Sequence, residues 1–367
     1  MRTQHILAGA AALVVASGSA LAQTSLTMYG IMDVAVEHIT NAAPDGGGLT
    51  RVPALTGSLP SRLGFRGIED LGGGLNANFT LEMGIAPDSG SMNQGGRAFG
   101  RQAFVGLSGP WGNLGFGRQY TMLFWSLLDS DVLGPHMHSM ANFDPYLPNT
   151  RADNSIAYRG SFSGFTVGAT YSLGRDVTNA GPSPAGTNCP GESATDSRAC
   201  REWSAMVKYE SAKWGAAAAV DELRGGPAAF GGLTSSSLTD RRATVNGYVR
   251  FAKAKFGAGV IRRNNQGSAA TPKSDLWFLG VTYPVTPVVT VDGQIVRLDM
   301  KNSSNDANLF IVRGIYALSK RTAVYASASH VSNGGAANFS ASGAQAGGNP
   351  PAGTGQTGVG VGVRHTF

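Results

Sequence analysis

The chain has 367 residues, of which 52 are glycine and 14% are charged, so glycine has about twice its usual share of roughly 7%. The formal net charge is +6, but the 29 Lys and Arg residues are dispersed and form no dense run, which argues against nucleic acid as a partner. Apolar residues rarely recur at helical spacing, and the composition favours many short strands joined by turns and loops.

The first 22 residues have the pattern of a secretory signal peptide. Arg2 precedes an apolar run from Ile6 to Ala16, and small residues then end in the sequence ALA at 20–22, which is typical of a cleavage site. The apolar run is shorter than the roughly 20 residues of a membrane-spanning helix, and no later run reaches that length. We therefore expect residues 1–22 to be removed on export. The remaining segment, 23–367, carries 28 basic and 23 acidic side chains, a net charge of +5.

Many segments alternate apolar and polar side chains over about 10 residues, as a strand does when it faces lipid on one side and water on the other. In one of them the apolar residues are Leu75, Ala77, Phe79, Leu81, Met83 and Ile85, and the polar ones between them include Asn76, Asn78, Thr80 and Glu82. Segments of this kind predict sixteen strands, at 26–38, 60–69, 75–86, 98–108, 113–120, 153–162, 165–173, 203–211, 215–223, 242–251, 255–263, 275–283, 288–300, 309–317, 322–332 and 357–367.

The connections between these strands differ in length. Short ones at 70–74, 109–112, 163–164 and 318–321 contrast with long ones at 39–59, 121–152, 174–202, 224–241 and 333–356. Hydrocarbon offers the backbone no hydrogen-bond partner, so a membrane sheet must close on itself. We predict an all-β fold, a closed 16-stranded antiparallel transmembrane β-barrel over 23–367. A secreted β-sandwich or β-solenoid is the alternative, and it would need one dry core along all the apolar faces.

The two cysteines, Cys189 and Cys200, lie in a segment rich in Gly, Pro, Ser and Asn. An exported chain meets an oxidising compartment, so we predict a disulfide that closes this loop. Two free thiols are the alternative. A metal site is disfavoured because no histidine flanks the pair.

Aromatic side chains occur near many predicted strand ends, where aromatic girdles of a barrel would place them. They are Tyr29, Phe65, Trp111, Tyr120, Tyr171, Trp203, Trp214, Trp277 and Tyr283. Strand propensity alone also favours aromatic residues.

An ordered set of short motifs resembles the general porins of Gram-negative bacteria, most closely those of the β-proteobacterial type. The motifs are LTMYG at 26–30, SRLGFRG at 61–67, EDLGGG at 69–74, RQAFVGL at 101–107, LGFGRQY at 114–120, NSIAY at 154–158 and VGVRHTF at 361–367. The terminal Phe367 resembles the barrel-assembly signal of that family.

This resemblance implies a passive diffusion channel for ions and small hydrophilic solutes. It implies a homotrimer in the outer membrane of a Gram-negative bacterium, surrounded by outer-membrane lipid and lipopolysaccharide. It also implies a third external loop folded into the lumen. On this basis we expect no cofactor, no metal and no enzymatic activity.

The segment 121–152 follows the fifth predicted strand, which is the position of the inward loop in the similar porins. We expect its acidic residues Asp129, Asp131 and Asp144 to hang inside the pore. The loop lacks the Pro-Glu-Phe turn found at the tip in the best-known form of that family.

The opposite side of the lumen is expected to be basic. Period-2 alternation puts Arg62 and Arg66 on the water-facing side of one strand. Arg101 and Arg151 fall where similar porins place further pore arginines, and Arg118 and Glu82 are additional candidates. An acidic loop facing a basic wall would create a transverse field and a weak anion preference. The alternative is that these arginines are scattered surface charges.

His136 and His138 are two residues apart in the same loop, and such a pair invites a metal or catalytic interpretation. Either role needs a third ligand or a nucleophile, and none is evident nearby. Three further functions stay open. A substrate-specific outer-membrane channel would need aromatic tracks or like-charge ladders in the lumen, and a barrel hydrolase would use Asp129 or Asp131 with a loop histidine. A structural or adhesive surface protein would have a plugged pore.

Overall fold

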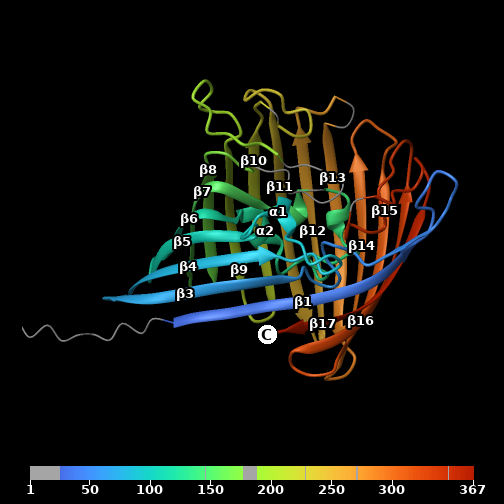
Figure 1. The fold of residues 1–367 in the computed structure, drawn as a ribbon, viewed down its shortest axis with the longest axis horizontal. Helices are drawn as coiled ribbons and strands as arrows, with labels where there is room; N and C mark the ends of the chain where they lie inside the picture. The colour runs from blue at the N-terminus through green and yellow to red at the C-terminus, as the bar shows by residue number, and fades with distance from the viewer. Residues whose placement is uncertain (1–24, 145, 177–187, 228, 270–271, 346) are drawn as a thin grey trace, which may run out of the picture.

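The computed structural model describes residues 25–367 apart from residues 145, 177–187, 228, 270–271 and 346. The predicted signal peptide, 1–22, lies outside the described residues. Within them, sixteen long strands form one closed antiparallel barrel (Figure 1). These are β1 (Ser25–Ile39), β3 (Arg62–Gly72), β4 (Leu75–Gly84), β5 (Gln102–Gly109), β6 (Gly112–Tyr120), β7 (Arg151–Phe162), β8 (Phe165–Ser172), β9 (Glu202–Glu210), β10 (Trp214–Arg224), β11 (Thr239–Phe251), β12 (Ala254–Asn265), β13 (Lys273–Pro284), β14 (Val289–Met300), β15 (Ala307–Ala317), β16 (Thr322–Asn333) and β17 (Gln356–Thr366).

The barrel closes because β1 pairs with β3 on one side and with β17 on the other. Met28 lies opposite Phe65 in the first pair, and Val34 lies opposite Val363 in the second. A short strand, β2 (Leu49–Arg51), pairs with the end of β1 beyond the reach of β3. Each long strand thus has two neighbours, as a hydrocarbon surrounding requires. The predicted 16-stranded barrel is confirmed, and the predicted strands differ from the observed ones only at their ends.

Side chains alternate between the two faces of the barrel wall. In β17, Val359, Val361 and Val363 are exposed on the outside, whereas in β16 Tyr325 and Ser329 are buried on the inside. The outer face is therefore apolar, which is the pattern that the sequence predicted. The inner face of β12 to β16 is also apolar in part, because residues such as Leu309 and Ile311 pack against Leu127 and Leu133 of the segment 121–150. Two of the aromatic residues expected in the outer girdles are exceptions. Tyr29 and Tyr120 point inward, because both hydrogen-bond to charged groups of the lumen.

The first and last strands meet at one end of the barrel. The backbones of Gly30 and Phe367 exchange two hydrogen bonds of 3.0 and 3.1 Å there. The connections at this end are short, as between β3 and β4, where Gly73 and Gly74 have φ values of +62° and +81° that favour glycine. The long connections lie at the other end (Figure 1).

The helical segments within the described residues are short. They are α1 (Asn93–Gly96), α2 (Met122–Leu127) and the 3₁₀ turns η1 (Met140–Asn142) and η2 (Leu147–Asn149). None of them is long and apolar enough to cross a membrane.

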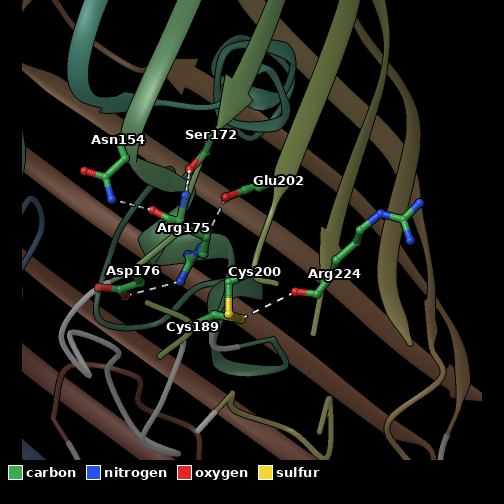
Figure 2. The surroundings of a disulfide bond; sticks show 9 residues. Asn154, Ser172, Arg175, Asp176, Cys189, Cys200, Glu202 and Arg224 are labelled. Atoms are coloured by element: carbon green, nitrogen blue, oxygen red, sulfur yellow. Dashed lines mark hydrogen bonds and ion pairs between the residues drawn. A yellow bond between two sulfur atoms is a disulfide. The ribbon is translucent and has the colours of Figure 1, made fainter. Parts of the chain in front are cut away.

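A disulfide joins Cys189 to Cys200 in the loop between β8 and β9 (Figure 2). Both cysteines are buried, and the backbones of Asp176 and Cys189 exchange two hydrogen bonds of 3.0 and 2.9 Å. Beside them, Arg175 Nη1 lies 3.3 Å from Asp176 and its Nε lies 3.6 Å from Glu202 of the barrel wall. The disulfide therefore fixes a loop whose charged residues reach the inner face of the barrel.

Candidate functional site

Three loops fold into the lumen, and they contact one another there. We call them inner loop 1 (residues 52–61), inner loop 3 (121–150) and inner loop 8 (334–355). The N–H of Met137 in inner loop 3 donates to the carbonyl of Gly57 in inner loop 1 at 2.8 Å, and the Met137 carbonyl accepts from Gly343 in inner loop 8 at 2.9 Å. Only inner loop 3 was expected inside the pore.

Inner loop 1 turns inward because Asp33 on β1 binds its backbone. The Asp33 carboxylate accepts hydrogen bonds from the N–H of Ser58 at 3.1 Å and of Leu59 at 2.9 Å, and also from the Tyr325 hydroxyl. The backbone of Asp33 exchanges two further bonds, both 2.9 Å, with the Ser61 hydroxyl. One buried carboxylate thus holds a segment that would otherwise leave the wall.

We expect the substitution Asp33→Asn to loosen inner loop 1, because the amide has only one acceptor oxygen for three donors. A buried donor left without a partner costs about 1–3 kcal/mol. Single-channel recordings in a planar bilayer should therefore give a larger conductance and more current noise than the wild type. Asp45→Asn, in the exposed part of the same connection, is the matched control. Unchanged conductance and noise in Asp33→Asn would contradict this role.

A cavity of about 360 Å³ lies between the three inner loops and the wall formed by β3 to β7. Among the described residues, its charged lining consists of Arg62, Arg101 and Arg151 and one acid, Glu82. Arg101 Nε lies 2.7 Å from Glu82 Oε1, whereas Arg62 Nε is 3.8 Å from Oε2. The four charged side chains leave a net charge of +2 at the cavity surface.

Tyr120 joins two of these arginines. Its hydroxyl accepts hydrogen bonds from Arg101 Nη2 at 2.8 Å and from Arg151 Nη2 at 2.9 Å. The guanidinium of Arg151 also lies over the Tyr120 ring, 4.6 Å from its centroid. The Tyr120 side chain therefore spaces two like charges that would otherwise repel each other.

Aromatic side chains of α2 extend this arrangement into the cavity. The rings of Tyr120 and Phe124 stack with centroids 3.9 Å apart, and Trp125 meets Phe124 edge-on at 5.4 Å. The guanidinium of Arg159, on β7, lies 3.6 Å from the centroid of Trp125. Arg159 was not among the predicted pore arginines, but its contact with Trp125 places its guanidinium on the inner face of the barrel.

The aspartates of inner loop 3 are not among the residues that line this cavity, which corrects the expectation that they face the arginine wall. Asp144 pairs with Arg242 of β11 through bonds of 2.7 and 2.9 Å. Asp129 pairs with Lys208 of β9, and Asp131 accepts a 2.9 Å bond from Gln294 of β14. All three acids fasten the loop to the opposite wall, where their charges are compensated or hydrogen-bonded.

The ion pairs of Asp144 determine its protonation. Burial alone would raise the pKa of Asp144, but the charges of Arg242 and Arg263 outweigh it and hold the pKa at about 2. For Asp131, burial outweighs the hydrogen bond from Gln294 and the charge of Arg313, so its pKa is raised above 3.8. Arg242 and Arg263 were missed from the sequence, because no local pattern relates strands β11 and β12 to a loop about 100 residues earlier.

Two other predicted wall arginines lie apart from the cavity. Arg118 pairs with Asp153 at 2.6 Å, and Asp153 also binds Arg97 at 2.9 Å. Arg66 is exposed, with its guanidinium 5.4 Å from the centroid of the Tyr29 ring. The structure thus brings together Arg62, Arg101, Arg151 and Glu82 and separates them from Arg66 and Arg118.

His136 and His138 are both buried within the loop cluster. His138 Nδ1 lies 3.1 Å from the Ser327 hydroxyl, and His136 Nδ1 accepts from the N–H of His138 at 3.0 Å. Burial lowers the pKa of His138 to about 3, and burial together with Arg313 lowers the pKa of His136 well below 6.5. Among the described residues, no group of three His, Cys, Asp or Glu side chains could hold a metal ion.

Comparison with known proteins agrees with this architecture. A family described as Gram-negative porin matches residues 9–336. The chain is 32% identical to outer membrane porin protein 32 of Delftia acidovorans, and the alignment covers 98% of either chain. It is 28% identical to an outer membrane porin protein of Bordetella pertussis, over 98% of this chain and 99% of that one. The structure is similar to an anion-selective porin from Comamonas acidovorans, with a TM-score of 0.76 and 26% identity over 94% of this chain and all of that one.

Proposed function

This chain belongs to the Gram-negative porin family, whose barrels are passive diffusion channels in the outer membrane, and we propose that its arginine-lined cavity is the constriction and favours anions. The observation that carries this proposal is the composition of the cavity wall. Three guanidinium groups and one carboxylate face the space between the inner loops and β3 to β7. The acids of inner loop 3 do not compensate them, because each is engaged at the opposite wall.

The predicted transverse field is therefore revised. Inner loop 3 supplies aromatic and apolar side chains to the cavity, and its negative charges lie elsewhere. An anion that enters meets an excess positive charge on the wall side. This favours a stronger anion preference than the net charge of +5 for the exported chain would suggest, since the charges at the narrowest point act most strongly on a permeating ion. The similar porin from Comamonas acidovorans is described as anion-selective, which supports the same preference here.

A planar-bilayer experiment tests this proposal. Purified protein is inserted into a membrane with a KCl gradient, and the zero-current potential is measured. We expect ohmic channels whose zero-current potential has the sign of chloride selectivity. A potential with the sign of potassium selectivity would contradict the anion preference, and a protein that inserts but passes no current would contradict the channel itself.

Family membership also leads us to propose a homotrimer that sits among outer-membrane lipid and lipopolysaccharide. Closure of one inserted channel unit in three equal current steps is the expected signature. The exposed apolar band of the barrel suits such a lipid surrounding. The family and the fold are those of a channel rather than of an enzyme, and we assign no catalytic residue.

A further inference from the structure

The cavity at the constriction is more apolar than passage of small hydrophilic solutes requires. Besides the charged residues, it is lined by Leu55 and Leu59 of inner loop 1 and by Phe124, Trp125, Leu128 and Leu147 of inner loop 3. The cavity therefore has an apolar surface and, beside it, a positively charged surface formed by guanidinium groups. Pockets of about 300–1,000 Å³ with an apolar lining and a few placed polar groups are typical of small-molecule sites, and the cavity of about 360 Å³ falls in that range.

Polar atoms without partners add to this picture. Five residues of the cavity lining have a buried side-chain nitrogen or oxygen that makes no hydrogen bond within the described residues: Gln94, His136, Ser139, Asn142 and Arg151. Buried polar groups are usually hydrogen-bonded, so a cluster of such atoms around one space suits a polar guest or bound water. The Arg151 atom is Nε, a donor on the same side chain that contacts Tyr120.

Among the aromatic side chains at the cavity, the ring of Phe124 remains available for stacking with a guest. One face of Tyr120 is covered by the Arg151 guanidinium, and the ring of Tyr120 stacks on Phe124. Trp125 is covered by Arg159. Phe124 is only half-buried and lines the cavity, so a planar guest could extend the stack of Arg151, Tyr120 and Phe124.

We propose that this cavity is a binding subsite for aromatic carboxylates, that is, anions with a planar ring and one carboxylate. The carboxylate accepts from the guanidinium groups of Arg62 and Arg151, which are less fully paired with Glu82 than Arg101 is, while the ring packs against Phe124 and the leucines. Neutral aromatic solutes lack the ionic contact, and aromatic cations are repelled by the excess positive charge. The inference rests on the proposed anion channel and specifies which anions it retains.

Benzoate is the probe, and acetate and benzylammonium are its comparisons. Binding to the detergent-purified protein is measured by isothermal titration calorimetry, and block of chloride current is measured in planar bilayers. We expect benzoate to bind at least tenfold more tightly than either comparison and to interrupt the chloride current. Phe124→Leu should weaken benzoate binding by up to about tenfold because it removes the stacking ring but keeps apolar volume.

Arg62→Gln should weaken benzoate binding by roughly tenfold or more, because it removes a charged donor. Trp111→Leu, which removes an exposed aromatic of the outer surface, is the matched control and should bind benzoate like the wild type. Equal binding of benzoate and acetate, or undiminished binding in Phe124→Leu, would overturn the inference while an intact anion-selective current left the proposed function standing. Conversely, specific benzoate binding by a protein without anion preference would uphold the subsite and contradict the proposed function.

Discussion

The double substitution Arg62→Gln with Arg151→Gln should abolish most of the preference for chloride over potassium. It leaves Arg101 paired with Glu82 at 2.7 Å, so the net charge around the cavity falls from +2 to zero. A unit charge about 6 Å from the path of an ion contributes about 0.7 kcal/mol even at the dielectric constant of water, in favour of the anion and against the cation. After screening by salt, we expect the permeability ratio to fall at least roughly tenfold.

The measurement is the zero-current potential in a KCl gradient, repeated at low and high salt. Arg297→Gln is the control, since it removes one positive charge from an exposed side chain on the outer face of β14. Its potential should equal that of the wild type. A double variant that kept the full chloride preference would show that the selectivity arises elsewhere in the lumen.

The barrel could be predicted from the sequence because its physical cause is local. Each strand meets lipid on one face and water on the other, so the alternation within about ten residues carries the signal. Arg62 and Arg66 show the limit of that signal. Alternation places both on the water side, but only Arg62 lines the cavity, while Arg66 lies by Tyr29.

The contacts of the loops could not be predicted in the same way. Asp144 binds Arg242, and the partners are 98 positions apart, so no spacing rule connects them. Similarly, Asp33 holds inner loop 1 from a strand that by its own pattern is an ordinary barrel strand. The role of Gly257 is likewise visible only in the structure. An added Cβ on Gly257 would lie 1.9 Å from the carbonyl oxygen of Ser130, so this glycine makes room for inner loop 3 against the wall.

The attachment of the inner loops should weaken in acid, and the buried His138 and His136 are the residues through which we expect this effect. For His138 the size can be given. Its pKa is about 3 in the folded protein because it is buried, against 6.5 for a free histidine. A detached loop therefore binds the proton more readily, and the attached state loses about 1.4 kcal/mol for each pH unit below 6.5, until about pH 3. Between pH 6.5 and pH 4.5 His138 alone should raise the fraction of time that the loop is detached roughly a hundredfold.

His136 acts in the same direction, since burial and Arg313 lower its pKa as well. Asp144 contributes in a different range: its pKa is about 2 instead of 3.8, so the stabilisation by its ion pairs is present above pH 3.8 and is lost below it. Fluctuations that appear between pH 6.5 and pH 4.5 therefore report on the histidines and not on Asp144.

Single-channel current noise recorded across this range is the measurement. His138→Gln should remove about half of the pH dependence, because His136 contributes the same slope over this range, and the double variant with His136→Gln should remove the rest. His330→Gln, at an exposed position on β16, should behave as the wild type. Noise in the wild type that is independent of pH from 6.5 to 4.5 would mean that the loops stay attached when the histidines are protonated.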